Sequence, residues 1–74
     1  GHAKGQFNAG ALVYNGVAGE PDLVEVYRWW TLAALQGHPQ AQAALDRVTP
    51  RLDATALARA QAEVAAHLQG LAGH

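Results

Sequence analysis

The sequence predicts an all-α protein of about four helices. Apolar residues recur with helical spacing in four separate stretches, few stretches alternate as strands do, and glycine, asparagine or proline separates the stretches. With 74 residues, the chain has room for one domain. Half of its residues are apolar but 17 of these are alanine, so we expect a thin core.

The first helix is predicted over residues 3–15. The Asn15-Gly16 pair is a helix stop signal, and a loop of mixed small residues follows over 17–21. The small and apolar residues of this helix fall on one face: Ala3, Phe7, Gly10, Ala11 and Tyr14. That face should therefore be the one that packs against the rest of the protein.

The second helix carries the clearest signals. Asp22 is placed to cap its start, Glu25 stands three residues later as in a capping box, and Gly37 stands where a left-handed residue ends a helix. The apolar residues between these caps follow helical spacing: Leu23, Val26, Tyr27, Trp30, Ala33 and Ala34. We expect Trp30 in the core and Trp29 at its edge, because neighbours on a helix point about 100° apart.

Small residues on both helices predict a close contact between them. Gly10 and Ala11 in the first helix, and Ala33 and Ala34 in the second, have almost no side chain. The two helix axes can therefore approach to the short end of the usual ~8–10 Å separation. We expect larger residues to fill the flanks of this contact: Phe7, Leu12, Tyr14, Tyr27 and Trp30.

The third helix is predicted to start at Pro39, which suits a first helical turn, and to stop near Val48. The reason for the stop is that Pro50 disfavours helical geometry in Thr49. His38 is interpreted as a residue of the linker before this helix. A link of two or three residues predicts that the second and third helices are antiparallel neighbours.

The fourth helix is predicted over residues 53–69. Asp53 is a good cap for its start, and Gly70 is placed to cap its end. Its apolar stripe has four members: Leu57, Ala60, Val64 and Leu68. Gln61 and Ala65 flank this stripe and add little apolar area.

A shift of the chain by 36 positions places "GHAKGQ", residues 1–6, on "GHPQAQ", residues 37–42. Beyond these residues the shift fails, because Trp29 and Trp30 would meet alanines. One full unit, the first helix of a second unit and a different last helix are the pattern found at the end of a repeat array. Gly1-His2 fits both the tail of a preceding repeat and the remnant of a tag, whereas Gly73-His74 is interpreted as coincidence or a tail.

The stretch "GQFNAGALVYNG" followed by "PDLVEVYRWWTLAALQGHPQAQAAL" resembles a Sel1-like repeat, of a family related to tetratricopeptide repeats. The residues that carry the resemblance are Gly10, Asn15-Gly16, Asp22, Trp29-Trp30, Ala33-Ala34 and Gly37. The sequence departs from the family pattern at Ala9, at Val13 and in the Val17-Ala18-Gly19 loop. The resemblance implies antiparallel helix pairs stacked as a short α-solenoid. Its full repeat would span 3–37, the next first helix 38–48, and a capping helix 53–69.

The same resemblance implies a non-enzymatic adaptor that binds a protein or peptide along a concave surface lined by first helices. It points to Gln6, Asn8 and Tyr14 as partner-binding positions, although Tyr14 could equally be core, and an exposed Trp29 would add a binding hot spot. Two alternatives stay open: a structural cap of a longer array, and self-association through an apolar strip on the first helix. The resemblance suggests a bacterial protein and leaves periplasmic, secreted and cytoplasmic locations open.

The residues with reactive side chains favour no enzyme and no cofactor. The chain has neither cysteine nor serine, and none of its four histidines stands one helical turn from another. Glu63 and His67 are one turn apart, which we interpret as a surface pair rather than as half a metal site. A net charge of −1 without a basic stripe argues against a nucleic-acid partner. The longest uncharged stretch contains Gly37 and Pro39, which argues against membrane insertion.

Overall fold

The computed structural model describes residues 2–16 and 21–72, and it is all-α over that part of the chain. Four α-helices follow one another, with a 3-10 helix before the last: α1 (His2–Asn15), α2 (Leu23–Leu35), α3 (Ala41–Val48), η1 (Thr49–Arg51) and α4 (Ala54–Ala72). The predicted fold class and the number of helices are therefore confirmed. The predictions for the Val17-Ala18-Gly19 loop, for Gly1 and for Gly73-His74 concern residues outside the described part of the chain.

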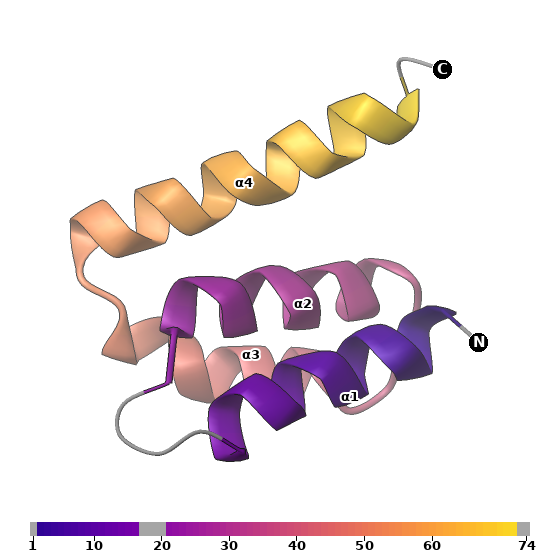
Figure 1. Ribbon diagram of the computed structural model, residues 1–74, viewed down its shortest axis with the longest axis horizontal. Coiled ribbons are helices and arrows are strands. Elements are labelled where there is room, and N and C mark those ends of the chain that lie inside the picture. The colour runs from indigo at the N-terminus through magenta and orange to yellow at the C-terminus, as the bar shows by residue number, and fades with distance from the viewer. Residues whose placement is uncertain (1, 17–20, 73–74) are drawn as a thin grey trace.

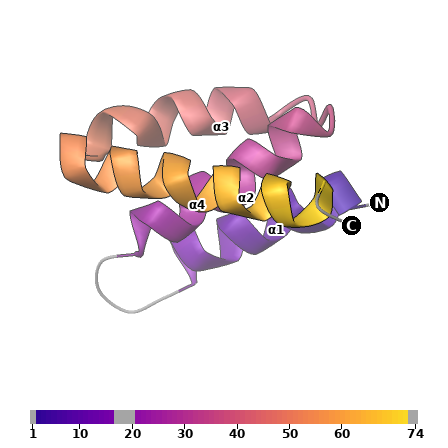
Figure 2. The same cartoon turned by 90° about the horizontal axis from the view of Figure 1, so that it is seen from above.

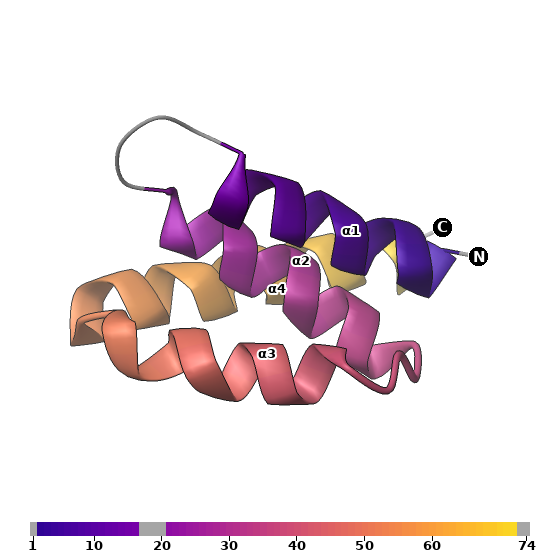
Figure 3. The same cartoon turned by 90° about the horizontal axis from the view of Figure 1, so that it is seen from below.

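Helix α2 is the centre of the fold. Figures 1 and 3 show α1 and α3 on its two flanks, and Figure 2 shows α4 lying over α2 on the side away from them. Each of the other three α-helices contacts α2. The reason is the wide apolar stripe of α2, whose buried residues reach from the side of α1 and α3 to the side of α4: Val26, Trp30, Leu32 and Ala33.

The main hydrophobic core lies between α2 and α3, and α1 closes one side of it. Its buried members are Val26 and Trp30 from α2 and Leu45 and Val48 from α3. Partly buried residues pack around them, most of them from α1 and α2: Phe7, Ala11, Val13, Tyr14, Leu23, Tyr27 and Ala44. The predicted burial of Trp30 is confirmed, because only 4% of its surface is exposed.

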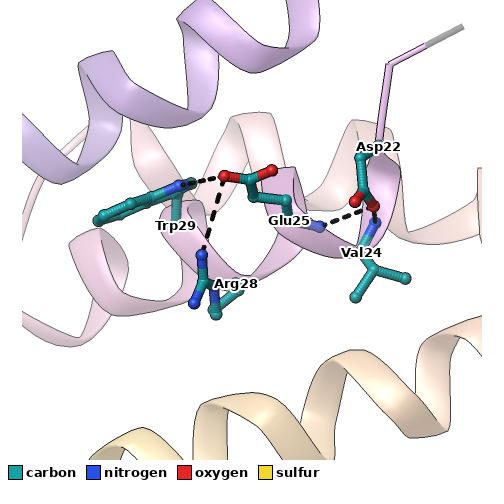
Figure 4. A network of polar contacts seen from close by, with 5 residues as sticks. All are labelled: Asp22, Val24, Glu25, Arg28 and Trp29. Atoms are coloured by element: carbon teal, nitrogen blue, oxygen red, sulfur yellow. Dashed lines mark hydrogen bonds and ion pairs between the residues drawn. The ribbon is translucent and has the colours of Figure 1, made fainter.

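The start of α2 is capped as predicted, but the capping box is incomplete. The Asp22 carboxylate accepts hydrogen bonds from the backbone N–H groups of Val24 (3.1 Å) and Glu25 (3.2 Å), as Figure 4 shows. The Glu25 side chain turns away from the cap and contacts Trp29 and Arg28 instead. A carboxylate this close to an indole N–H and a guanidinium has better partners there than a solvated backbone amide.

Gly37 ends α2 in the left-handed conformation that the sequence predicts, with φ of 87°. Two backbone hydrogen bonds accompany it, from Gly37 N–H to the Ala34 carbonyl and from His38 N–H to the Ala33 carbonyl, both 3.0 Å long. This is the Schellman pattern, which satisfies carbonyl groups that the helix end would leave without partners.

Replacing Gly37 by alanine should lower the free energy of unfolding by about 1 kcal/mol, because a side chain at positive φ is strained. Chemical denaturation monitored by circular dichroism measures the change. Gly37→Asn is the matched variant and should recover part of the loss, because asparagine tolerates this conformation better. Equal stability of the wild-type protein and the alanine variant would contradict the role of this cap.

Helix α3 differs from its prediction in its start and in the reason for its end. Its α-helical part starts at Ala41 rather than at Pro39, which lies in a turn. It ends at Val48 as predicted, but the stated reason is wrong, because Thr49 keeps helical angles (φ −54°, ψ −46°) in front of Pro50. The chain tightens into η1 there, and the Thr49 hydroxyl donates to the Leu45 carbonyl at 2.7 Å.

Helix α4 starts as predicted and runs further than predicted. The Asp53 carboxylate accepts a hydrogen bond of 2.7 Å from the backbone N–H of Ala56, which caps the helix. Gly70 lies inside the helix and does not end it, since α4 continues to Ala72. Alanine-rich sequence on both sides of Gly70 has a high helix propensity, which outweighs one unfavourable glycine.

Candidate protein-interaction surface

Gly10 is a buried residue of α1 that packs closely against α2. A Cβ atom on this buried residue would lie 2.5 Å from the Nε1 atom of Trp30 and 3.1 Å from the Cβ atom of Trp29. The close contact of the first two helices is therefore present. The atoms nearest to Gly10 belong to the tryptophan pair, one helical turn before the alanines Ala33 and Ala34 that we expected to meet it.

Trp30 fixes the inner face of α1. Its indole N–H donates a hydrogen bond of 3.1 Å to the carbonyl oxygen of Phe7. Its ring stacks on Phe7 with 5.9 Å between centroids and meets Tyr14 edge-on at 5.6 Å. These contacts occupy the side of α1 that faces the core, so that side is not free to bind a partner.

Trp29 lies at the edge of the core and its ring is held from two sides. Its indole N–H donates to the Glu25 carboxylate at 3.4 Å, and the Arg28 guanidinium lies 5.2 Å from the ring centroid. Arg28 and Glu25 are themselves 3.8 Å apart, which closes the network drawn in Figure 4. The predicted position of Trp29 at the core boundary is confirmed, since its side chain is only partly buried.

An open groove runs between α1 and α2, with Trp29 as one wall. Its remaining lining comes from one side of α1: His2, Gly5, Gln6 and Ala9. Gly5 and Ala9 leave the backbone of α1 close to the surface of the groove. The Gln6 side-chain oxygen accepts a hydrogen bond of 2.8 Å from the Gln36 amide, which joins the start of α1 to the end of α2. We call these five lining residues the Trp29 groove.

The other two predicted partner-binding residues lie elsewhere. Asn8 lines a second open groove, on the outer side of α1, with four further residues: Ala11, Leu12, Asn15 and Gly16. Tyr14 is in neither groove, because it is partly buried in the core and its hydroxyl accepts a hydrogen bond from Arg51 of η1. Of the two roles weighed for Tyr14, its contacts match the core.

Leu12 is where sequence reasoning was wrong about α1. It was expected to fill the flank of the helix–helix contact, but 70% of its surface is exposed. Leu12 stands two residues after Gly10, which places it about 200° around the helix and so away from α2. The spacing from Gly10 was the signal that could have predicted this.

His38 is a second residue whose contacts the sequence did not predict. It lies in the link before α3, as expected, but its ring also stacks on Phe7, with 4.4 Å between centroids and 12° between planes. Its Nδ1 atom accepts a hydrogen bond of 3.2 Å from the backbone N–H of Gln40. His38 therefore connects α1 to the start of α3.

Among residues 2–16 and 21–72, no three histidine, aspartate or glutamate side chains gather where they could hold a metal ion. Glu63 pairs with Arg59 at 3.6 Å, one turn away on α4, while His67 is exposed. In the same part of the chain, no helix combines the length and the apolar character that crossing a bilayer requires.

Comparisons with protein-family models, with curated proteins and with solved structures gave no match. The function must therefore be argued from the two grooves on α1 and the residues that line them.

Proposed function

We propose that this chain is a non-enzymatic protein-interaction module that binds a protein or peptide in the Trp29 groove. The observation that carries the proposal is the partly exposed indole of Trp29, held in place by Glu25 and Arg28 at the wall of an open groove. Tryptophan is among the residues most enriched at the centres of binding interfaces, where one side chain often contributes ~2 kcal/mol or more.

The groove suits a polypeptide ligand for two physical reasons. Gly5 and Ala9 present almost no side chain, so the backbone of a partner can approach α1 closely. The Trp29 ring is already held in one orientation by Glu25 and Arg28, which lowers the entropy lost when a partner orders it. Gln6 is half-buried beside the ring and offers an amide for hydrogen bonding.

We also propose that the fold is a short α-solenoid of antiparallel helix pairs, related to Sel1-like repeats. In this interpretation residues 3–37 form a full repeat, 38–48 the first helix of the next repeat, and 53–69 a capping helix. The central position of α2, with α1 and α3 on its flanks, supports the proposal. The cap at Gly37 supports it too, because it joins α2 to the following turn without a long loop.

Site-specific photo-crosslinking tests the binding proposal. A photoreactive amino acid at Gln6 should give a discrete crosslinked product in cells that express the protein, and Trp29→Ala should weaken that product about tenfold or more. The matched control is the same photoreactive residue at the exposed Gln61 of α4, which should give no such product. Binding is then measured with the purified partner. Equal crosslinking from both positions, or no effect of Trp29→Ala, would overturn the proposal.

A second candidate function rests on Leu12, the exposed leucine of the outer groove. An apolar side chain in this position could contact a second copy of the chain, or a preceding repeat if the chain caps a longer array. Both alternatives use the face of α1 opposite the core, so one substitution tests them together.

If the chain self-associates through this face, Leu12→Lys should convert a dimer into a monomer, as measured by sedimentation equilibrium. The change in unfolding free energy of the monomer should stay within about 0.5 kcal/mol, because the side chain is exposed. Leu35→Lys is the matched control, since Leu35 is also exposed but lies at the end of α2. A wild-type chain that is monomeric at high concentration would exclude self-association.

A further inference from the structure

We infer that α4 can undock from α2 as one unit, while α1, α2 and α3 stay folded together. The inference concerns the side of α2 that faces α4 and does not depend on the proposed function. It follows from the apolar and polar side chains that lie between α4 and α2.

The first observation is that the main core contains no residue of α4. The cluster around Trp30 and Val26 draws only on α1, α2 and α3. On α4 the buried side chains are Ala60 (0% exposed) and Val64 (7%), both small, while Leu68 further along is 40% exposed. The buried side chains that α4 itself contributes are therefore small, and we expect docking of α4 to contribute less than the three-helix core does.

The second observation is a set of polar atoms buried without hydrogen-bond partners. On α2 these are Arg28 Nε and Thr31 Oγ1. Arg28 and Thr31 stand three residues apart on α2 and so share one face. In the view of Figure 4, Arg28 lies on the side of α2 nearer to α4, and its guanidinium is turned toward Glu25.

A buried polar group that lost its water and gained no partner opposes the packing that buries it. Undocking of α4 would return both groups to water, so it would recover their hydration. The polar groups and the small apolar contact therefore act in the same direction, and both weaken the hold of α2 on α4.

Undocking would uncover an apolar strip on α2. Leu32 is only 4% exposed but does not belong to the main core cluster. It stands two residues after Trp30 and so points to the other side of α2 from α1 and α3, where Figure 2 shows α4. Helix α4 therefore covers Leu32, and undocking of α4 would expose this leucine to solvent.

Native-state hydrogen exchange on the full chain, read amide by amide, tests the inference. The amides at the centre of α4, residues 59–67, should exchange about 100-fold faster than the central amides of α2, because a local opening requires less free energy than global unfolding. Equal exchange rates in the slowest amides of α4 and α2 would show that all four helices open together, and would overturn the inference.

The variant that tests the cause is Thr31→Val, which removes an unpaired buried hydroxyl and keeps the shape of the side chain. It should slow exchange in α4 about tenfold. The matched control, Thr55→Val, makes the same change at an exposed position of α4 and should leave the exchange rates almost unchanged. If Thr31→Val leaves exchange in α4 unchanged, or slows α2 by the same factor, the inference is wrong.

Discussion

Replacing Trp30 by alanine should leave the chain largely unfolded at 25 °C. Loss of a large buried aromatic side chain lowers the free energy of unfolding by about 3–5 kcal/mol, and a core in a chain of this size supplies about the same amount. The substitution also removes the donor to the Phe7 carbonyl and the ring that Phe7 and Tyr14 contact. Far-UV circular dichroism at 25 °C and a urea titration measure the loss.

Two variants separate the contributions of Trp30. Trp30→Phe keeps an aromatic ring but loses the N–H donor, so it should lower stability by about 1–2 kcal/mol through the lost hydrogen bond and a smaller side chain. Trp29→Ala is the neighbouring control and should lower stability by only about 1 kcal/mol, because Trp29 is partly exposed. A Trp30→Ala protein with the wild-type urea midpoint would show that the core does not depend on this ring.

Gly10→Ala should lower the free energy of unfolding by about 2 kcal/mol. The added Cβ would lie 2.5 Å from Trp30 Nε1 and 2.6 Å from Trp30 Cδ1, so the indole must move and its bond to Phe7 must weaken. Overpacking of this kind costs about 1–3 kcal/mol, and a lost hydrogen bond adds about 1 kcal/mol. The higher helix propensity of alanine returns about 1 kcal/mol.

The same substitution at Gly5 should have the opposite sign. A Cβ atom there meets nothing within 4 Å, and the residue is exposed in the same helix. Gly5→Ala should therefore raise stability by about 0.5–1 kcal/mol through helix propensity alone. Urea titrations of both variants measure the difference. If both substitutions stabilise the protein, Trp30 does not limit the approach of α1 to α2.

The sequence predicted best those features that depend on neighbouring residues. Asp22, Asp53 and Gly37 all cap the helices that they were expected to cap, because a cap needs only the residues within one turn. The burial of Trp30 was also predictable, because helical spacing fixes which residues share a face.

The sequence predicted less well the features that depend on tertiary contacts. The Glu25 side chain fits a capping box but contacts Trp29 and Arg28. The expected partners of Gly10 were alanines, and the offset between α1 and α2 brought tryptophan there instead. Helical spacing says which face of each helix is apolar, but not how far two helices slide along each other.

The candidate site was predictable only in part. Gln6 and Trp29 line one groove as the predictions would require, but Asn8 lies in another and Tyr14 packs in the core. A choice among exposed positions of one helix needs the placement of α2 beside it. The small residues Gly5 and Ala9, which shape the Trp29 groove, show no signal in the sequence that distinguishes them from other small residues.

The turn between α2 and α3 is held tightly by its contacts. Its backbone is bonded back to α2 through Gly37 and His38, forward to Gln40 through the His38 ring, and across to α1 by the stacking of that ring on Phe7. A connection on the surface of a protein usually tolerates inserted residues. Here one extra residue would disturb the hydrogen bonds to α2, the hydrogen bond at Gln40 and the stacking on Phe7. This turn therefore fixes the orientation of α3 relative to α2, and inserted peptides or tags should be placed elsewhere in the chain.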